Sequence, residues 1–234
     1  MRDRVVLLAV TKMLSGFCVG GISLSTRKWI RPVKEFGTIL IGDIRYSDRT
    51  YMRMFDVVEF EMAKHRPRPP HIEDWVTDFV RARPKLVGRV RDAKRAEFLR
   101  RSAEADFSWL KSSTPDRSLD LVGPLFGQNA SPTGPFCAVF RKDDYSGKYD
   151  VRLEIDGDRG YPVTDLKWRA LGRTLVGSGG EVKLDQKALQ EKLGAEEIYV
   201  SFGLSRLHEG RYWPLIVGVH PVPDYTIDID YSNP

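Results

Sequence analysis

Hydrophobic and polar positions along this chain follow mostly the pattern of β-strands. Residues 56–62 alternate Val58, Phe60 and Met62 with a more polar set, which predicts a half-buried strand with one polar face. Residues 17–24 form an apolar run with two glycines in its middle, which suits a bulge or the sharp coil of a small barrel. The other ranges that fit strands are 4–10, 29–33, 118–125, 137–141, 149–155, 198–204 and 213–219.

A smaller part of the chain shows helical spacing. Residues 72–80 and 91–103 place apolar side chains at helical intervals, and residues 184–193 read as an amphipathic helix. Asp165 can cap a further short helix through its side chain. Three prolines within residues 65–71 exclude a helix or a central strand there.

The order of these elements predicts a mainly β (α+β) protein built from two small β-barrels with inserted helices. Residues 111–115 have the composition of a linker, so we place a boundary nearby. The first domain then covers residues 1–117, with a helical insertion at about 72–104, and the second covers residues 118–234. A turn signal at Asp156-Gly157 predicts a hairpin in the second domain.

Composition describes a soluble chain, and the distribution of charge adds more than its total. The 234 residues are 41% hydrophobic and 29% charged, enough for one large domain or two small ones. The net charge of +5 is too small to establish a nucleic-acid partner. Residues 1–117 carry 24 Lys and Arg against 15 Asp and Glu, whereas residues 118–234 carry 13 against 17. We therefore expect any surface that faces a polyanion to lie mainly in the N-terminal half.

Cysteine usage and the start of the chain point to a reducing compartment. Cys18 and Cys137 stand far apart in apolar runs, which favours buried thiols in strands over a disulfide or a zinc site. The apolar run at residues 5–10 is too short for a signal segment or a membrane span. We expect a cytoplasmic protein without a membrane partner.

Several short motifs resemble those of the dual OB-containing domain family. Within residues 7–33 these are a lysine after the first strand, Ser-Gly-x-Cys-Val-Gly-Gly-Ile, and Lys-Trp-Ile-Arg-Pro-Val; Asp56-Val57-Val58 follows in the expected order. Weaker blocks recur in the second half, among them residues 163–165 with Trp168, residues 201–204 and residues 212–218. The resemblance implies two OB-like barrels and a role with nucleic acid in bacterial or phage defence and repair systems. It carries no catalytic residues.

OB folds bind single strands with a basic groove and aromatic faces on which bases stack. Trp29 and Arg31 share one face of a predicted strand and supply both ingredients, with Lys12 and Lys28 as further charge. The alternative is that Trp29 packs in the barrel and Arg31 pairs with a carboxylate, because Trp is usually well buried.

Further basic groups give the predicted site a wider rim. Arg45 and Tyr46 lie between strands, where a binding loop or a plain solvated connector fits equally well. The helix at residues 91–103 either tracks phosphates or presents an ordinary solvated face. Its candidate rim residues are Arg91, Lys94 and Arg95. Arg66 and Arg68 contact phosphate or belong to a rigid surface linker.

Catalytic signatures are absent from the sequence. There is no GxxxxGK[ST], HExxH or GxSxG motif, and we predict no cofactor and no metal. The aspartates Asp224, Asp228 and Asp230 could hold a divalent metal for a nuclease, although an exposed acidic tail is the simpler interpretation. The leading hypothesis is non-catalytic binding of single-stranded or structured DNA or RNA. The alternative is a protein-interaction adaptor that recruits an enzyme partner; the oligomeric state stays open.

Overall fold

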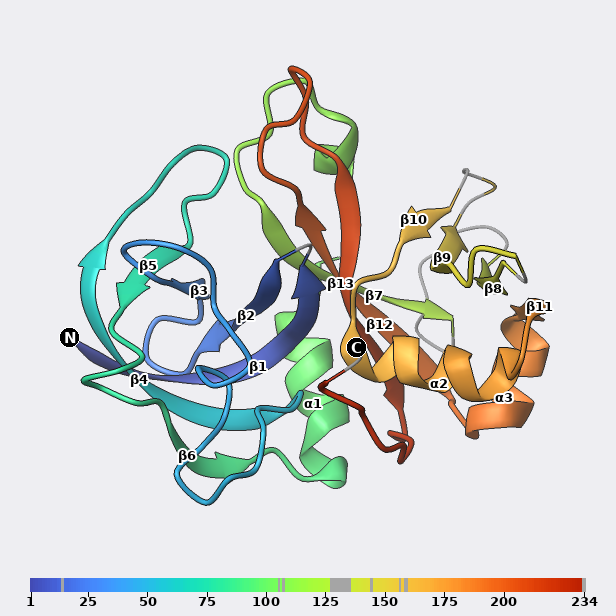
Figure 1. The fold of residues 1–234 in the computed structure, drawn as a ribbon, viewed down its shortest axis with the longest axis horizontal. Coiled ribbons are helices and arrows are strands. Elements are labelled where there is room, and N and C mark those ends of the chain that lie inside the picture. The colour runs from blue at the N-terminus through green and yellow to red at the C-terminus, as the bar shows by residue number, and fades with distance from the viewer. Residues whose placement is uncertain are drawn as a thin grey trace.

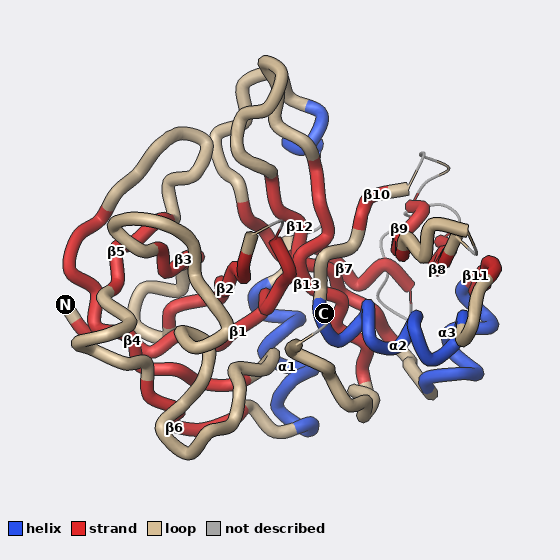
Figure 2. The backbone as a smooth tube through the Cα atoms, in the orientation of Figure 1, coloured by secondary structure: helices blue, strands red, loops and turns tan. Residues whose placement is uncertain are grey.

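The computed structural model describes residues 1–13, 15–104, 106, 108–126, 136–143, 145–155, 157 and 160–232, and it is built mostly from strands (Figures 1 and 2). Two strand-rich bodies lie side by side, with helices α1 and α2 beside and between them (Figure 1). This confirms the predicted mainly β class. No helix in the described ranges is long and apolar enough to cross a membrane.

The first body is a closed five-stranded barrel. Its strands are β1 (Arg2–Met13), β2 (Gly16–Ser23), β3 (Trp29–Val33), β4 (Asp56–His65) and β5 (Asp74–Thr77). They pair in the order β1-β2-β3-β5-β4, and β4 pairs back onto β1 to close the ring. The pairing of β3 with β5 is parallel, and the other pairings of the ring are antiparallel. This order and closure make the barrel OB-like, as predicted.

The glycines of β2 explain how the barrel coils so tightly. A Cβ atom on Gly21 would lie 2.0 Å from the carbonyl oxygen of Val6, so β1 and β2 approach closely only because no side chain stands between them. The register of this pair shifts between Leu7 and Ala9. The predicted role of these glycines in a coiled strand is confirmed.

The helix predicted at residues 72–80 is wrong. The segment contains β5, which pairs with both β3 and β4, and it is followed by β6 (Lys85–Arg89) on the edge of β4. The apolar spacing of this segment fits a helix or a strand, and its pairing with β3 and β4 decides for the strand. The helical insertion is therefore α1 alone (Asp92–Ser102), followed by one 3-10 turn, η1 (Ser108–Lys111).

The second body consists of two sheets over one core. The first sheet has the order β10-β9-β8-β11 and the second β13-β12-β7. Their bounds are β7 (Leu119–Phe126), β8 (Phe136–Lys142), β9 (Tyr149–Ile155), β10 (Tyr161–Pro162), β11 (Gly180–Asp185), β12 (Glu197–Leu204) and β13 (Pro214–Val222). A parallel bridge between Val163 and Ile216 joins the two sheets. The arrangement of β7, β8, β9, β13 and β12 thus resembles the order of the first barrel, although no ladder joins β7 to β8 or β9 to β13 within the described residues.

Two helices complete this second barrel. Asp165 caps α2 (Leu166–Val176) by accepting hydrogen bonds from the backbone N–H groups of Lys167 and Trp168, as predicted. The helix predicted at residues 184–193 begins two residues later as α3 (Gln186–Leu193), because Leu184 pairs with β8 in β11. The predicted turn at Asp156-Gly157 includes Asp156, which lies outside the described residues.

The two barrels share buried side chains. Val6 and Leu8 of β1 pack with Leu121 of β7 and Tyr199 of β12, while Tyr231 near the C-terminus lies in the core of the first barrel. Both cysteines are free and lie in strands as predicted, but they are only partly buried because they point outward from β2 and β8.

Candidate nucleic-acid interface

Trp29 and Arg31 lie on a face that the second barrel covers. On the outer face of the first barrel, Ala9 of β1 packs with Leu119 and Val217 of the second half. Trp29 packs against this cluster. A Cβ on Gly20 would already touch the Leu119 side chain at 3.4 Å. The outer face of β2 and β3, which OB folds commonly use for oligonucleotides, is here an interface between the two barrels.

Arg31 is a buried ion-pair residue. Its side chain is 9% exposed, its Nε donates to Asp74 Oδ1 at 2.6 Å, and its Nη2 lies 3.2 Å from Glu73 Oε1. Arg206 from the second barrel reaches the other oxygen of Asp74 at 2.8 Å. The predicted contact of Arg31 with phosphate is therefore corrected: its charge is already compensated by two carboxylates, as the alternative interpretation expected.

Tyr46 is buried as well. It is 3% exposed, and its hydroxyl donates to Asp56 Oδ2 at 2.9 Å. Arg89 Nε donates to the other oxygen of Asp56 at 2.7 Å, and the backbone N–H of Arg53 donates to Oδ2. These donors lower the pKa of Asp56, but burial outweighs them and raises it above its ordinary value. Tyr46 therefore has no free ring face for a base, and its predicted stacking role is corrected.

The remaining predicted residues are dispersed. Arg45 is exposed, with its guanidinium 5.7 Å from the Tyr51 ring and its Nε donating to the carbonyl of Arg49. Lys12 lies partly buried over the Phe17 ring, and Lys28 is exposed in the turn between β2 and β3.

Helix α1 contributes exposed charge and contacts with the second half of the chain. Arg91 and Lys94 are exposed. Arg95 is partly buried, pairs with Asp92 and with Asp224 from the C-terminal segment, and lies 4.7 Å over the Phe55 ring. Arg95 therefore connects the halves, whereas Arg91 and Lys94 stay available to a ligand.

Four exposed arginines lie next to Asp56 or next to Tyr46, whose hydroxyl donates to Asp56. They are Arg45, Arg49, Arg53 and Arg89, and Arg91 and Lys94 follow along the chain. Tyr51, whose ring lies 5.7 Å from the Arg45 guanidinium, is partly buried and has one ring face stacked on Tyr231 at 4.4 Å. This surface therefore offers mainly cations, for phosphates.

A second basic surface combines one loop from each barrel. The first loop, residues 66–73, joins β4 to β5, and the second, residues 205–213, joins β12 to β13 and forms the orange-red tip of Figure 1. We call them the paired loops. His71 Nε2 lies 3.1 Å from the carbonyl oxygen of Ser205, and the Tyr212 hydroxyl donates to the carbonyl of Pro69 at 3.4 Å. Each joins the fourth to the fifth strand of its barrel, a position where OB folds bind oligonucleotides.

Tight turns fix the tips of both loops. Arg68 and His71 exchange backbone hydrogen bonds of 3.0 and 2.8 Å, and His208 and Arg211 do the same at 3.0 and 3.2 Å. Glu209 and the glycine after it have positive φ angles of 51° and 77°, the conformation of a type I′ hairpin turn. The arginines at these turns are therefore held on a rigid backbone.

The paired loops carry both cations and an aromatic face. Arg68, Arg206 and Arg211 are exposed, against the exposed acidic side chain of Glu209. Trp213 is 40% exposed, and the Arg211 guanidinium lies 4.2 Å over its ring. Sequence reasoning weighs Arg68 but misses Arg211 and Trp213, because the second half is acidic overall. The available signal was the basic and aromatic run between two strands, residues 206–213.

Buried contacts beneath the paired loops set their relative position. Ser118 Oγ donates to Glu73 Oε1 at 2.5 Å and lies 2.6 Å from His71 Nδ1. Burial raises the pKa values of Glu73 and Asp74, but hydrogen bonds and the Arg31 charge outweigh it and hold both below their ordinary values. Both carboxylates are thus ionised at neutral pH, and they tie the two loops into one unit.

The corresponding outer face of the second barrel is uncovered but has no aromatic platform among its described residues. Arg141 pairs with Glu181, and Arg152 with Asp150, across the β8, β9 and β11 strands. Alternating paired charges of this kind neutralise one another locally, so this face attracts a polyanion weakly.

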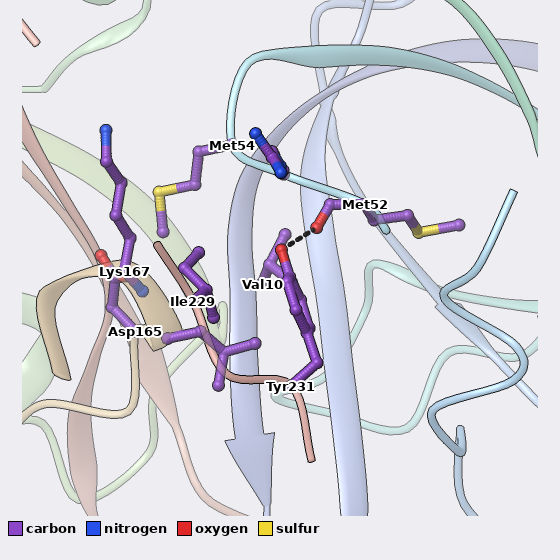
Figure 3. A pocket seen from close by; sticks show the side chains of 9 residues that line it. Val10, Met52, Met54, Asp165, Lys167, Ile229 and Tyr231 are labelled. Atoms are coloured by element: carbon purple, nitrogen blue, oxygen red, sulfur yellow. Dashed lines mark hydrogen bonds between the residues drawn. The ribbon is translucent and has the colours of Figure 1, made fainter. Parts of the chain in front are cut away.

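The interface between the barrels also encloses a small cavity, shown in Figure 3. Its volume is about 50 Å³, and its lining includes Val10, Asp165, Lys167 and Tyr231. The Tyr231 hydroxyl donates across it to the carbonyl of Met52 at 3.0 Å. A space of this size holds a few water molecules and is too small for a base.

The alternative of a metal site on the C-terminal aspartates receives no geometric support. Asp224 is engaged by Lys167 at 2.6 Å and by Arg95, while Asp228 and Asp230 are exposed. In the part of the chain that the structure describes, no three His, Cys, Asp or Glu residues gather as a metal site requires.

Comparison with known proteins gives one match. The model of the family described as dual OB-containing domain matches residues 3–114, which hold the first barrel, α1 and η1. No curated protein and no solved structure matches the chain. The match covers the part of the chain that closes into the five-stranded barrel, and residues 3–114 are similar to the dual OB-containing domain family.

Proposed function

We propose that this protein binds single-stranded nucleic acid, without catalysis, on the paired loops. The observation that carries the proposal is the joint presentation of Arg68, Arg211 and Trp213 by the loops between the fourth and fifth strands of two OB-like barrels. An exposed ring next to fixed cations can stack a base and hold the neighbouring phosphate. The similarity of residues 3–114 to a family of OB-containing domains supports the same class of ligand.

The arginines around Asp56 add long-range attraction in this proposal. Arg45, Arg91 and Lys94 are exposed, and exposed charges attract a polyanion over about one Debye length, ~8–10 Å at physiological salt. Lys28 contributes in the same way. A role in a bacterial or phage defence or repair system, which the family resemblance implies, is part of the proposal and gives the context in which such a ligand would be met.

The test is fluorescence anisotropy with a labelled single-stranded oligonucleotide of mixed sequence. Trp213→Ala should raise the Kd about 5- to 150-fold, the effect of losing one base stack worth ~1–3 kcal/mol. Tyr145→Ala is the matched control, because Tyr145 is a fully exposed ring elsewhere on the surface. Equal binding by wild type and Trp213→Ala, or no binding by wild type at low salt, would remove the paired loops as the site.

A salt titration tests the cationic part. Arg68→Ala with Arg211→Ala should reduce the slope of log K against log salt by about 0.7 for each phosphate that the double variant no longer neutralises. The control is Arg101→Ala, because Arg101 is an exposed α1 residue that already pairs with Glu97 at 2.7 Å. A slope unchanged in the double variant would contradict direct binding of phosphate by the two loops. The same oligonucleotide incubated with Mg²⁺ should remain uncleaved.

A second function, recruitment of a protein partner, is favoured by one exposed apolar segment. Phe36 is 84% exposed and Leu40 53%, in a loop that is held to the barrel by the hydrogen bond from Phe17 N–H to the Ile39 carbonyl. Grouped apolar exposure on a fixed backbone is typical of protein interfaces. Phe36→Ser with Leu40→Ser should abolish co-purification of a stoichiometric partner and leave oligonucleotide affinity unchanged; retention of the partner would argue against this segment.

A further inference from the structure

Two arginines of α2 lie against one tyrosine without a carboxylate partner among the described residues. The guanidinium carbons of Arg169 and Arg173 each lie 5.0 Å from the centre of the Tyr149 ring. The Tyr149 hydroxyl donates to the backbone carbonyl of Arg169 at 2.8 Å, which fixes the ring on the helix. The two cations are thus held on a single rigid aromatic residue.

Close packing fixes this arrangement further. A Cβ atom on Gly172 would lie 2.1 Å from the Tyr149 hydroxyl oxygen and 2.0 Å from Phe140. Tyr149 therefore sits directly on the helix backbone, between the positions of Arg169 and Arg173, which are one helical turn apart. The absence of a side chain at Gly172 is what allows the ring to lie there.

Three other arginines in this half of the molecule have carboxylate partners. Arg141 pairs with Glu181, Arg152 with Asp150, and Arg206 with Asp74. By contrast, no ion pair within 4 Å joins Arg169 or Arg173 to a described carboxylate, and the charge of Asp150 acts on Arg169 only from farther away. Two like charges at positions i and i+4 of a helix destabilise it, so this pair has an unfavourable arrangement until an anion is bound.

Arg169 also has a buried hydrogen-bond donor without an acceptor in the described part of the chain. Its Nε is buried and has no hydrogen-bond acceptor in the described ranges. Burial, and after it the charge of Arg173, lowers the pKa of this guanidinium below its ordinary value. A buried N–H without an acceptor costs free energy that an oxyanion would recover.

We propose that Arg169, Arg173 and Tyr149 form a binding site for a terminal phosphate group. Planar guanidinium groups match phosphate oxygens in pairs, and stacking on an aromatic ring orients them. Two positive charges match a phosphomonoester, which carries about −1.5 to −2 at pH 7, better than they match a phosphodiester. The ligand is a free phosphomonoester or the phosphorylated end of a nucleic-acid strand.

This site is separate from the paired loops. It lies on α2 and the start of β9, on the right of Figure 1, whereas the β12–β13 tip is at the top. The inference therefore does not depend on the proposed function. Phosphate binding without oligonucleotide binding would support this site alone, and the reverse would support the paired loops alone.

The first experiment measures inorganic phosphate binding by isothermal titration calorimetry at constant ionic strength. Wild type should bind phosphate. Arg173→Gln should raise the Kd for phosphate by about tenfold or more, because charge-assisted hydrogen bonds are removed. Arg141→Gln is the control, since it removes an arginine of the same barrel that already has a partner. Circular dichroism confirms that each variant is folded, and Arg173→Lys, which keeps the charge but not the planar fork, should bind with intermediate affinity.

A second arm identifies the source of the phosphate. Adenosine monophosphate is compared with adenosine, and a 5′-phosphorylated oligonucleotide with the same strand ending in a hydroxyl. If adenosine monophosphate binds better than adenosine but the two strands bind equally, the ligand is a small phosphomonoester. If the phosphorylated strand also binds better than the hydroxyl-ended strand, the ligand is a strand end. Equal phosphate binding by wild type and Arg173→Gln, or no heat with wild type at millimolar phosphate, would overturn the proposal.

Discussion

Replacing Arg31 by Met tests whether this arginine supports the fold or a ligand. Methionine keeps most of the apolar stem and removes the charge that faces Glu73 and Asp74, whose side chains are 4% and 1% exposed. Breaking a buried ion pair by removing one partner typically costs ~3–5 kcal/mol. Asp74 keeps Arg206 and Glu73 keeps Ser118, so we expect the low end of that range, about 3 kcal/mol of unfolding free energy.

Urea unfolding followed by tryptophan fluorescence measures this change in stability. The control is Arg81→Met, because Arg81 is 91% exposed and lies 3.8 Å from its partner Asp78, so its removal should leave the urea midpoint unchanged. A decrease below about 1 kcal/mol for Arg31→Met, the range of exposed pairs, would refute the structural role. Oligonucleotide affinity of the folded variant should equal that of wild type, because Arg31 does not reach the surface.

The same variant has a characteristic pH dependence. In wild type the pKa values of Glu73 and Asp74 are lowered on folding, so their stabilisation is complete above about pH 4 and is lost as pH falls through the folded values. Without Arg31, both pKa values rise, because one of the groups that lower them is removed, and the ionised carboxylates stabilise the fold less above about pH 4. The gap in unfolding free energy between wild type and Arg31→Met should therefore narrow below about pH 4; a constant gap would contradict the ion-pair explanation.

Three further changes test other contacts. Burial raises the pKa of Asp165 to about 7, so the native state binds its proton more tightly than the unfolded chain; stability should fall between about pH 4 and pH 7, and Asp165→Asn should remove that fall in urea midpoints. Gly172→Ala should lower the unfolding free energy by ~1–3 kcal/mol through overpacking, while Gly88→Ala, where a Cβ meets nothing within 4 Å, should not. Tyr46→Phe should cost about 1.5–3 kcal/mol, because Asp56 is left without one buried donor, and should leave oligonucleotide affinity unchanged; weaker binding by the folded variant would restore Tyr46 as a contact residue.

The local sequence pattern was sufficient to predict an element where one residue or one short run of residues determines it. Alternation at residues 56–62 predicted β4, the side chain of Asp165 predicted the start of α2, and the glycines of β2 predicted a coiled strand. It was insufficient at residues 72–80, where apolar spacing fits a helix and the segment pairs as β5. The pairing partners of β5 come from residues 31–33 and 62–65, so no local signal contains them.

The candidate site depended on long-range packing even more strongly. The sequence marked Trp29, Arg31 and Tyr46 as aromatic and basic, but it could not show that Leu119 and Val217 cover the outer face of the first barrel. Charge counted by halves pointed away from the β12–β13 loop, because a sum over 117 residues hides a local basic turn.

The sequence by itself determined that this is a mainly β protein with small barrels, since strand periodicity and glycine placement act over a few residues, and its short motifs carried the resemblance that implies OB-like barrels. Only the tertiary structure decided which surface is open, because burial depends on what the second half places against the first. That packing turned Arg31 into an ion-pair residue and brought Arg68 and Trp213 onto one pair of loops. It also left Arg169 and Arg173 without carboxylate partners in the described part of the chain, although nothing in their sequence distinguishes them from arginines that are paired.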